Sequence, residues 1–183
     1  PAIKDVNKDI TVITGGTSPA SSTDGRLSPP DFISALYSEG GKGYFDAIAA
    51  HPYTFPVTTS YKNKDNAWGQ LATIHKTMED HGDGDRKIWL TEYGAPTGGP
   101  GPTATIVDMK LSQSPYHVDE ALQAKTVTDF VASVKSTSWV GPICWYTYKD
   151  SGTTQDTNEN FFGLVRADGS KKPGYSSFVQ SIK

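Results

Sequence analysis

The chain has 183 residues and a formal net charge of -3, a size suited to one domain with a substantial core. This charge gives no support for binding to nucleic acid or to an anionic membrane surface, and no apolar run is long enough to cross a bilayer. A single cysteine, Cys144, excludes an internal disulfide, and the apolar run around it predicts a buried, unreactive thiol.

Strands and helices alternate through the first half of the chain. The predicted elements are a helix tail at 1–7, a strand at 10–14, a helix from Ser28, a strand at 44–50 and a helix at 65–81. Gly15 and Gly16 end the first strand. Ser28 can cap the helix that follows it, and Pro29 suits the first helical position.

The second half repeats this order. The predicted elements are a strand at 87–91, a long Gly/Pro-rich loop at 93–115, a helix from about Val118, a strand at 142–147, a polar loop at 149–160 and a helix from about Pro173. Short apolar strands that alternate with helices predict a parallel α/β fold whose strands are buried on both faces.

Functional side chains of parallel α/β proteins gather where strands end, and Glu92 ends the third predicted strand. Alternation places Glu92 on the same side as Ile88 and Leu90, which we expect to be the inner face. A carboxylate at the mouth of an apolar interior is costly unless it has a use. The alternative is a Glu that forms a structural ion pair or caps a loop.

Two further strand ends carry ring side chains. His51 and Tyr53 follow the second strand on one side of it, and two hydrogen-bonding rings there would make a cleft wall. Trp145, in the fourth strand, would form either an apolar floor for a sugar ring or a large core residue.

Four stretches in this order resemble the clan A glycoside hydrolases, with family 39 and family 5-like enzymes as the nearest kinds. They are AHPY (50–53), WLTEYG (89–94), ICWYTYKD (143–150) and FFGLVRADGSKKPGY (161–175). The resemblance implies an α/β fold of the (β/α)8 TIM-barrel type, with the four predicted strands as strands five to eight. A complete barrel usually needs about 250 residues. We therefore expect residues 1–183 to form one C-terminal half-barrel.

The resemblance also implies roles for individual residues. Glu92 matches the catalytic nucleophile, Tyr53 the tyrosine that hydrogen-bonds it, and His51 a histidine that lines the cleft near the acid/base side. Trp145 and Tyr148 are the implied substrate-binding residues. The peptide bond after Trp145 is expected to be cis, as is common in this clan.

The acid/base glutamate of these enzymes follows an asparagine at the end of strand four, and we expect it to be missing from this chain. Asn158 and Glu159 repeat the dipeptide, but they lie in a polar loop after the last strand. The predicted function is hydrolysis of O-glycosidic bonds by a retaining mechanism, with this chain inactive alone. The alternative is a carbohydrate-binding or structural half-barrel without catalysis.

A half-barrel also predicts partners. Its two open sheet edges invite pairing, either with an N-terminal half or with a second copy of the chain. We expect its inner face to be exposed when alone, at Ala47, Ala49, Ile88, Leu90 and Ile143. The expected ligand is a carbohydrate, without metal, cofactor, nucleic acid or membrane. Secretion follows from the enzyme class alone.

Overall fold

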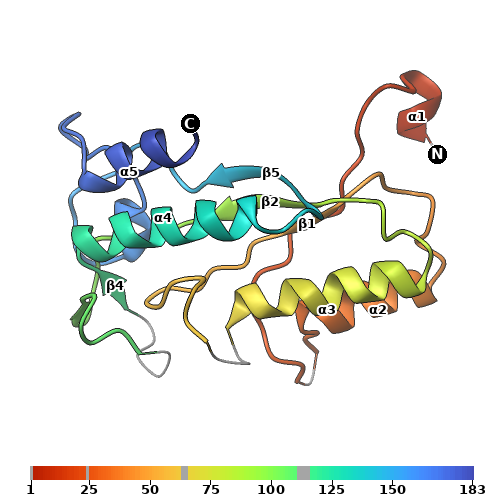
Figure 1. Cartoon of the computed structure of the whole chain (residues 1–183), viewed down its shortest axis with the longest axis horizontal. Coiled ribbons are helices and arrows are strands. Elements are labelled where there is room, and N and C mark those ends of the chain that lie inside the picture. Colours follow the sequence, from red (N-terminus) through yellow and green to blue (C-terminus); the bar gives the residue numbers. More distant parts are fainter. Residues whose placement is uncertain (1, 24, 63–65, 111–115) are drawn as a thin grey trace. The chain divides into compact units, whose positions relative to one another are not determined.

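The computed structural model describes residues 2–23, 25–62, 66–110 and 116–183 (Figure 1). The chain divides into two compact units. Unit 1 comprises Pro1–Pro52, Ala67–Glu92 and Trp139–Ile143, and unit 2 comprises Tyr53–Asn66, Tyr93–Ser138 and Cys144–Lys183.

Helices and strands alternate through most of the chain, as the sequence predicts. In chain order they are α1 (Ala2–Val6), α2 (Pro29–Ser38), β1 (Ile48–Ala50), α3 (Ala67–Asp80), β2 (Ile88–Tyr93), β3 (Thr103–Ala104), β4 (His117–Val118), α4 (Glu120–Lys135), β5 (Val140–Trp145), the short 3-10 helix η1 (Asn158–Phe161) and α5 (Pro173–Ser181). The main sheet has the order β1-β2-β5, and β1 runs parallel to β2. None of the described helices has the length and apolar character needed to cross a membrane.

Local capping explains where several helices begin. The backbone of Ser28 is extended, and its hydroxyl accepts a hydrogen bond from the backbone N–H of Asp31, which starts α2 as expected. Asp119 caps α4 in the same way, through the N–H of Leu122 at 2.7 Å. The expected start of α5 at Pro173 is confirmed. The expected start of α3 at Asp65 lies outside the described residues.

The segment predicted as the first strand runs beside β1 without forming a continuous strand. Parallel bridges join Ile13 to Ala47 and Thr17 to Ala50, and the N–H of Thr14 donates to the carbonyl of Ala47 at 3.2 Å. These bonds hold the segment against the sheet, although they are too few for a full ladder.

The long loop after β2 contains order that the sequence did not predict. Its two-residue strands β3 and β4 pair in parallel, and residues 111–115 of the loop lie outside the described part. Ala104 of β3 and Val118 of β4 form a buried cluster with Ala95 and Leu122, and each of the four is no more than 2% exposed. This small apolar cluster accounts for the ordered pairing.

The expected inner face of the strands is wrong. Ile88 and Leu90 are fully buried, and in the register Leu90 stands opposite Ala50. Ala50 lines a small cavity together with Leu71 and Ile74 of α3, so this side of the sheet faces a helix. The sequence gives the alternation but cannot tell which face the helices cover.

The expected exposure of this face in the isolated chain is also wrong. Ala47 and Ala49 are 2% and 1% exposed, and Ile143 is half-buried. The exposed residues of β5 are instead Pro142 and Cys144. The prediction of a buried thiol therefore fails, because β5 is at the end of the strand order and has one hydrogen-bonded neighbour in the main sheet.

Helix pairs pack within each unit. In unit 1, α2 packs against α3, and the two lie side by side in Figure 1. In unit 2, α4 packs against α5. The ring of Phe130 on α4 stacks on Tyr93, with centroids 4.0 Å apart, and both side chains are fully buried. This stack anchors the residue that directly follows Glu92.

Candidate active site

Glu92 and His51 lie beside each other in unit 1. Since Ala50 stands opposite Leu90, the residues that follow them, His51 and Thr91, meet at the same end of the two parallel strands. The Nε2 atom of His51 is 2.9 Å from Oγ1 of Thr91. Its Nδ1 atom is 3.5 Å from Oε2 of Glu92. The register of the strands thus brings an imidazole and a carboxylate together.

The two side chains differ in exposure. The side chain of Glu92 is 39% exposed and that of His51 is 16% exposed. The hydroxyl of Ser18 approaches Nδ1 of His51 to 3.4 Å. The carboxylate is therefore open to a ligand, whereas the imidazole beside it is largely covered and has polar neighbours at both nitrogens.

The His51 ring lies against bare backbone. A Cβ atom at Gly16 would be 2.0 Å from Nε2 of His51, so a side chain at this position is incompatible with the ring where it stands. At the neighbouring Gly15 a Cβ would meet nothing within 4 Å. The backbone N–H of His51 donates to the carbonyl of Thr17 at 2.9 Å. Gly16 and Thr17, which follow the first predicted strand, therefore help to position the His51 ring.

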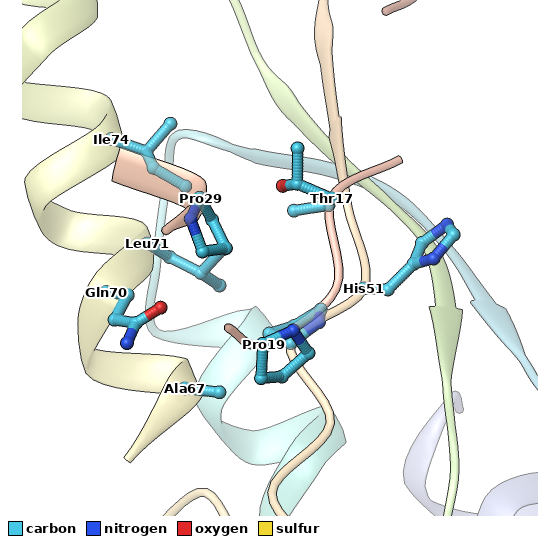
Figure 2. Close-up of a pocket in the computed structure, with 10 residues that line it drawn as sticks. Thr17, Pro19, Pro29, His51, Ala67, Gln70, Leu71 and Ile74 are labelled. Carbon is cyan, nitrogen blue, oxygen red and sulfur yellow. The ribbon is translucent and has the colours of Figure 1, made fainter. Parts of the chain in front are cut away.

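The helix side of β1 is apolar. Figure 2 shows the small cavity there, with Pro29 of α2 and Leu71 and Ile74 of α3 among its lining residues. In the same view the imidazole of His51 points away from α3. His51 thus lines the cavity while its ring is turned away from the helix.

Unit 2 gathers aromatic residues around Tyr93. The ring of Tyr53 stacks on Tyr93 with centroids 6.5 Å apart, and Trp145 meets Tyr93 edge to face at 5.9 Å. The hydroxyl of Tyr93 is 2.7 Å from Oγ1 of Thr54, and burial raises the pKa of Tyr93 well above its ordinary value. Tyr93 is thus a neutral packing residue that holds two predicted site residues, Tyr53 and Trp145.

Trp145 has the contacts of a half-buried core residue. Its indole N–H donates to the carbonyl of Phe162 at 3.2 Å, and its ring meets Phe130 edge to face. Its role beneath a sugar stays a prediction. The expected cis bond after Trp145 is wrong: among the described residues, the cis bond outside X-Pro pairs joins Tyr146 to Thr147.

The loop after β5 presents polar and aromatic side chains. Tyr148 is 68% exposed, as a ligand-contacting ring requires. The hydroxyl of Tyr146 donates to Oε2 of Glu159 at 3.3 Å, and the N–H of Glu159 donates to Oγ1 of Thr157, which caps η1. Glu159 is therefore an exposed residue of a short helix, not the end of a buried strand.

A buried ion pair organises unit 2. Nζ of Lys172 donates to Oδ1 of Asp150 at 2.7 Å, to Oγ1 of Thr97 at 2.7 Å and to the carbonyl of Phe161 at 3.1 Å. Asp150 also accepts the N–H of Gly163 at 2.8 Å. One ammonium thus ties together the loop after β2, the loop after β5 and the start of α5.

The structure brings together His51 and Glu92 in one unit and Tyr53 and Trp145 in the other. Convergence of all four at one site stays a prediction. The sequence reasoning missed Thr91, although this residue directly precedes Glu92. Its hydroxyl contacts the His51 ring. The sequence reasoning also missed Gly16, for which the double glycine after a strand was the available signal. In the described part of the chain, no group of three His, Cys, Asp or Glu side chains is placed to hold a metal ion.

Comparison with known proteins adds to this geometry. The family model described as "glycosyl hydrolase catalytic core" matches residues 7–173. A family 39 glycoside hydrolase from Bacteroides cellulosilyticus has a TM-score of 0.71 and 26% identity over 99% of this chain and 35% of its own. A monomeric beta-xylosidase from Caulobacter crescentus has a TM-score of 0.56 and 15% identity over 97% of this chain and 34% of its own. None of the curated proteins searched matches the chain.

These matches agree with the resemblance read from the sequence. GH5_18 from Streptomyces cattleya, solved in complex with GlcNAc, also matches, with a TM-score of 0.51 and 20% identity over 75% of this chain and 30% of its own. The chain spans about a third of the length of these solved structures, as part of a TIM barrel would. Since the family model covers most of the sequence, the chain belongs to the glycosyl hydrolase catalytic core family.

Proposed function

We propose that this chain carries the nucleophile of a retaining glycoside hydrolase and that Glu92 is that nucleophile. The observation that carries the proposal is the exposed Glu92 carboxylate at the end of β2, 3.5 Å from His51, in a chain of a glycosyl hydrolase family. Catalytic groups of (β/α)8 enzymes lie at the ends of their strands. Carbohydrate is the expected substrate.

The chemistry assigns a bond-forming step to Glu92. Its carboxylate attacks the anomeric carbon and forms a glycosyl ester, while a second carboxyl group about 5–5.5 Å away protonates the leaving oxygen. Water then hydrolyses the ester with help from that second group. Tyr53 would donate a hydrogen bond to Glu92, His51 would line the cleft, and Trp145 and Tyr148 would contact the sugar.

We propose that the second carboxyl group comes from outside these 183 residues. Glu159, the candidate that the sequence offers, accepts a hydrogen bond from Tyr146 in an exposed loop. The chain would then form strands five to eight of the barrel and pair with an N-terminal half or with a second copy of itself. Secretion is proposed from the enzyme class alone.

Trapping of the glycosyl ester tests the central assignment. The protein encoded by the whole reading frame is incubated with 2-fluoro aryl glycosides, which form the ester but hydrolyse it slowly, and the labelled peptide is identified by mass spectrometry. We expect one sugar on Glu92. A label on another residue would remove Glu92 from this role, and turnover without any trapped ester under several sugars would contradict the retaining mechanism.

The 183-residue chain itself gives a second test. General acid catalysis is typically worth 10²–10⁴-fold, so we expect the isolated chain to cleave aryl glycosides at a small fraction of the rate of the whole protein. Its mass in solution is measured in parallel. A monomer of normal activity would show that this chain contains both carboxyl groups. Sugar binding without any turnover by the whole protein would favour the alternative of a binding half-barrel.

A further inference from the structure

Both nitrogens of the His51 ring have polar neighbours of known chemistry. Nε2 is 2.9 Å from the hydroxyl of Thr91, while Nδ1 is 3.5 Å from Oε2 of Glu92 and 3.4 Å from the hydroxyl of Ser18. A hydroxyl can donate or accept a hydrogen bond, but an ionised carboxylate can only accept. The three neighbours therefore do not favour the two neutral forms of imidazole equally.

The carboxylate decides where the proton of neutral His51 lies. With the proton on Nδ1, an N–H faces the Glu92 carboxylate and the hydroxyl of Ser18, both of which accept. With the proton on Nε2, the lone pair of Nδ1 would face a negative charge. Nε2 is then the bare nitrogen, and the hydroxyl of Thr91 is the group placed to donate to it.

We propose that Thr91 is a positioning residue that fixes the tautomer of His51, so that an N–H points at the Glu92 carboxylate. The tautomer follows from the contacts alone, and its catalytic consequence rests on the proposed role of Glu92. Thr91 suits this task because it lies within β2 and because branching at Cβ restricts its χ1 rotation.

Two further contacts keep the ring in this orientation. The backbone of Gly16 leaves no room for a Cβ atom beside Nε2, so the ring has a wall on that side. The N–H of His51 is held by the carbonyl of Thr17. The ring is therefore constrained at its backbone, at Nε2 and along one face, while Nδ1 lies 3.5 Å from the carboxylate.

This arrangement would orient the nucleophile. An N–H near Oε2 would hold that oxygen and so fix the orientation in which the Glu92 carboxylate attacks. The contact of 3.5 Å is longer than a normal hydrogen bond, and contacts of this kind commonly shorten once a substrate fills the site. Thr91 would act through His51 without touching substrate.

The tautomer can be measured on the ¹⁵N-labelled chain without any substrate. Long-range ¹H–¹⁵N correlation spectra distinguish a protonated from a bare ring nitrogen, and His51→Phe assigns the signals. At a pH where the ring is neutral, we expect Nδ1 protonated and Nε2 bare. A proton on Nε2 of His51 in the wild-type chain would overturn the proposal. This measurement does not depend on whether any variant folds.

Variants of Thr91 test the cause. Thr91→Ser keeps the hydroxyl and should keep the Nδ1–H form, whereas Thr91→Val removes it and should move the population toward the Nε2–H form. Thr128→Val, an exposed threonine of α4, is the matched control and should change neither ring nitrogen of His51. An unchanged His51 tautomer in folded Thr91→Val would overturn the role of Thr91.

Kinetics separate this inference from the proposed function. In the protein encoded by the whole reading frame, Thr91→Val should lower kcat by a few-fold to about tenfold, the scale of one hydrogen bond, with KM little changed. Thr91→Ser should restore most of the loss. If wild type has no glycosidase activity, the proposed function fails while the spectra still decide the tautomer. If Thr91→Val has the kcat of wild type, the positioning role fails and the proposed function stands.

Discussion

Lys172–Asp150 in unit 2 and His51–Glu92 in unit 1 each join a basic side chain to a carboxylate, and the two pairs are built differently. Lys172 and Asp150 in unit 2 are 1% and 5% exposed and 2.7 Å apart. His51 and Glu92 in unit 1 are 16% and 39% exposed and 3.5 Å apart. The atoms of the first pair are close together and buried, whereas those of the second pair are farther apart and partly exposed to solvent.

The hydrogen bonds of the two pairs show what each can do. The Lys172 ammonium makes three hydrogen bonds, which leaves it no donor for a ligand. Burial lowers the pKa of Lys172, although Asp150 beside it acts in the opposite direction. A buried ion pair of this kind can hold loops in place but cannot bind substrate. The Glu92 carboxylate, at 39% exposure, is accessible to one.

The comparison predicts that a substitution in the exposed pair lowers activity, whereas one in the buried pair lowers stability. The largest expected effect is the loss of activity at Glu92. Glu92→Gln in the protein encoded by the whole reading frame should lower kcat by about 10⁴-fold or more, because an amide cannot form the glycosyl ester. The side chains are nearly isosteric and the residue is partly exposed, so the urea midpoint should stay close to that of wild type. Rates on aryl glycosides and urea unfolding are the two measurements.

Glu159→Gln is the matched control for that experiment. It makes the same chemical change at an exposed carboxylate outside the main sheet, which in the structure accepts a hydrogen bond from Tyr146. We expect a far smaller loss of kcat. Comparable losses at both positions would break the assignment of one nucleophile, and a large loss at Glu159 alone would transfer it.

Lys172→Met should have the reverse effect, on stability. It leaves Asp150 buried without its cation, and removal of one partner of a buried pair typically costs about 3–5 kcal/mol. Urea unfolding of the 183-residue chain measures the loss. Lys76→Met is the control, because Lys76 forms an exposed pair with Asp80 on α3 and exposed ion pairs contribute little to stability. Equal losses for both variants would contradict the structural role of Lys172.

The two adjacent glycines before Thr17 give a smaller and more local contrast. Gly16→Ala places a Cβ against the His51 ring and should cost about 1–3 kcal/mol, the usual range for overpacking, with displacement of the ring. Gly15→Ala meets no atom within 4 Å and should be tolerated. Urea unfolding and the chemical shifts of His51 measure both effects. An unshifted His51 ring in Gly16→Ala would mean that its place is not set by this backbone.

The sequence predicted what depends on local chemistry. Ser28 and Pro173 mark helix starts through capping and proline geometry, which involve residues within one turn. Glu92 and His51 could both be placed at strand ends of a parallel sheet, but the resemblance put His51 near the acid/base side and did not predict its contact with Glu92. The roles that the family resemblance assigns to Tyr53, Trp145 and Tyr148 stay predictions.

What the sequence missed depends on packing between distant segments. Alternation along β2 separates two faces, but only α3 shows that Ile88 and Leu90 lie on the covered one. Cys144 is exposed because of the place of β5 in the strand order, which its apolar neighbours do not reveal. The pairing of Asp150 with Lys172 joins two surface-type residues of polar loops, and no local pattern marks them as buried.

The smallest predicted effect concerns Asp129, whose exposure lies between those of the two pairs. Its carboxylate accepts from the hydroxyl of Ser60 at 2.6 Å and from Lys125 at 2.9 Å, and its side chain is 15% exposed. Burial acts to raise the pKa of Asp129, but hydrogen bonds from Ser60, Thr58 and Lys125 outweigh it and lower the pKa below the ordinary 3.8. A carboxyl group with a lowered pKa stabilises the fold when it is ionised.

The sign of the pH effect follows from that shift. Because the pKa of Asp129 is lower in the folded chain than in the unfolded chain, its stabilisation is complete above about pH 4 and is lost as the pH falls through the lowered value. Asp129→Asn should therefore cost about 0.5–1 kcal/mol at pH 7, a range reduced for solvent screening, and almost nothing near pH 2. Asp80→Asn, at the exposed pair of α3, should cost less at pH 7. Urea unfolding at both pH values decides it: a cost for Asp129→Asn that is the same at pH 2 and pH 7 would show that its hydrogen bonds, rather than its charge, stabilise unit 2.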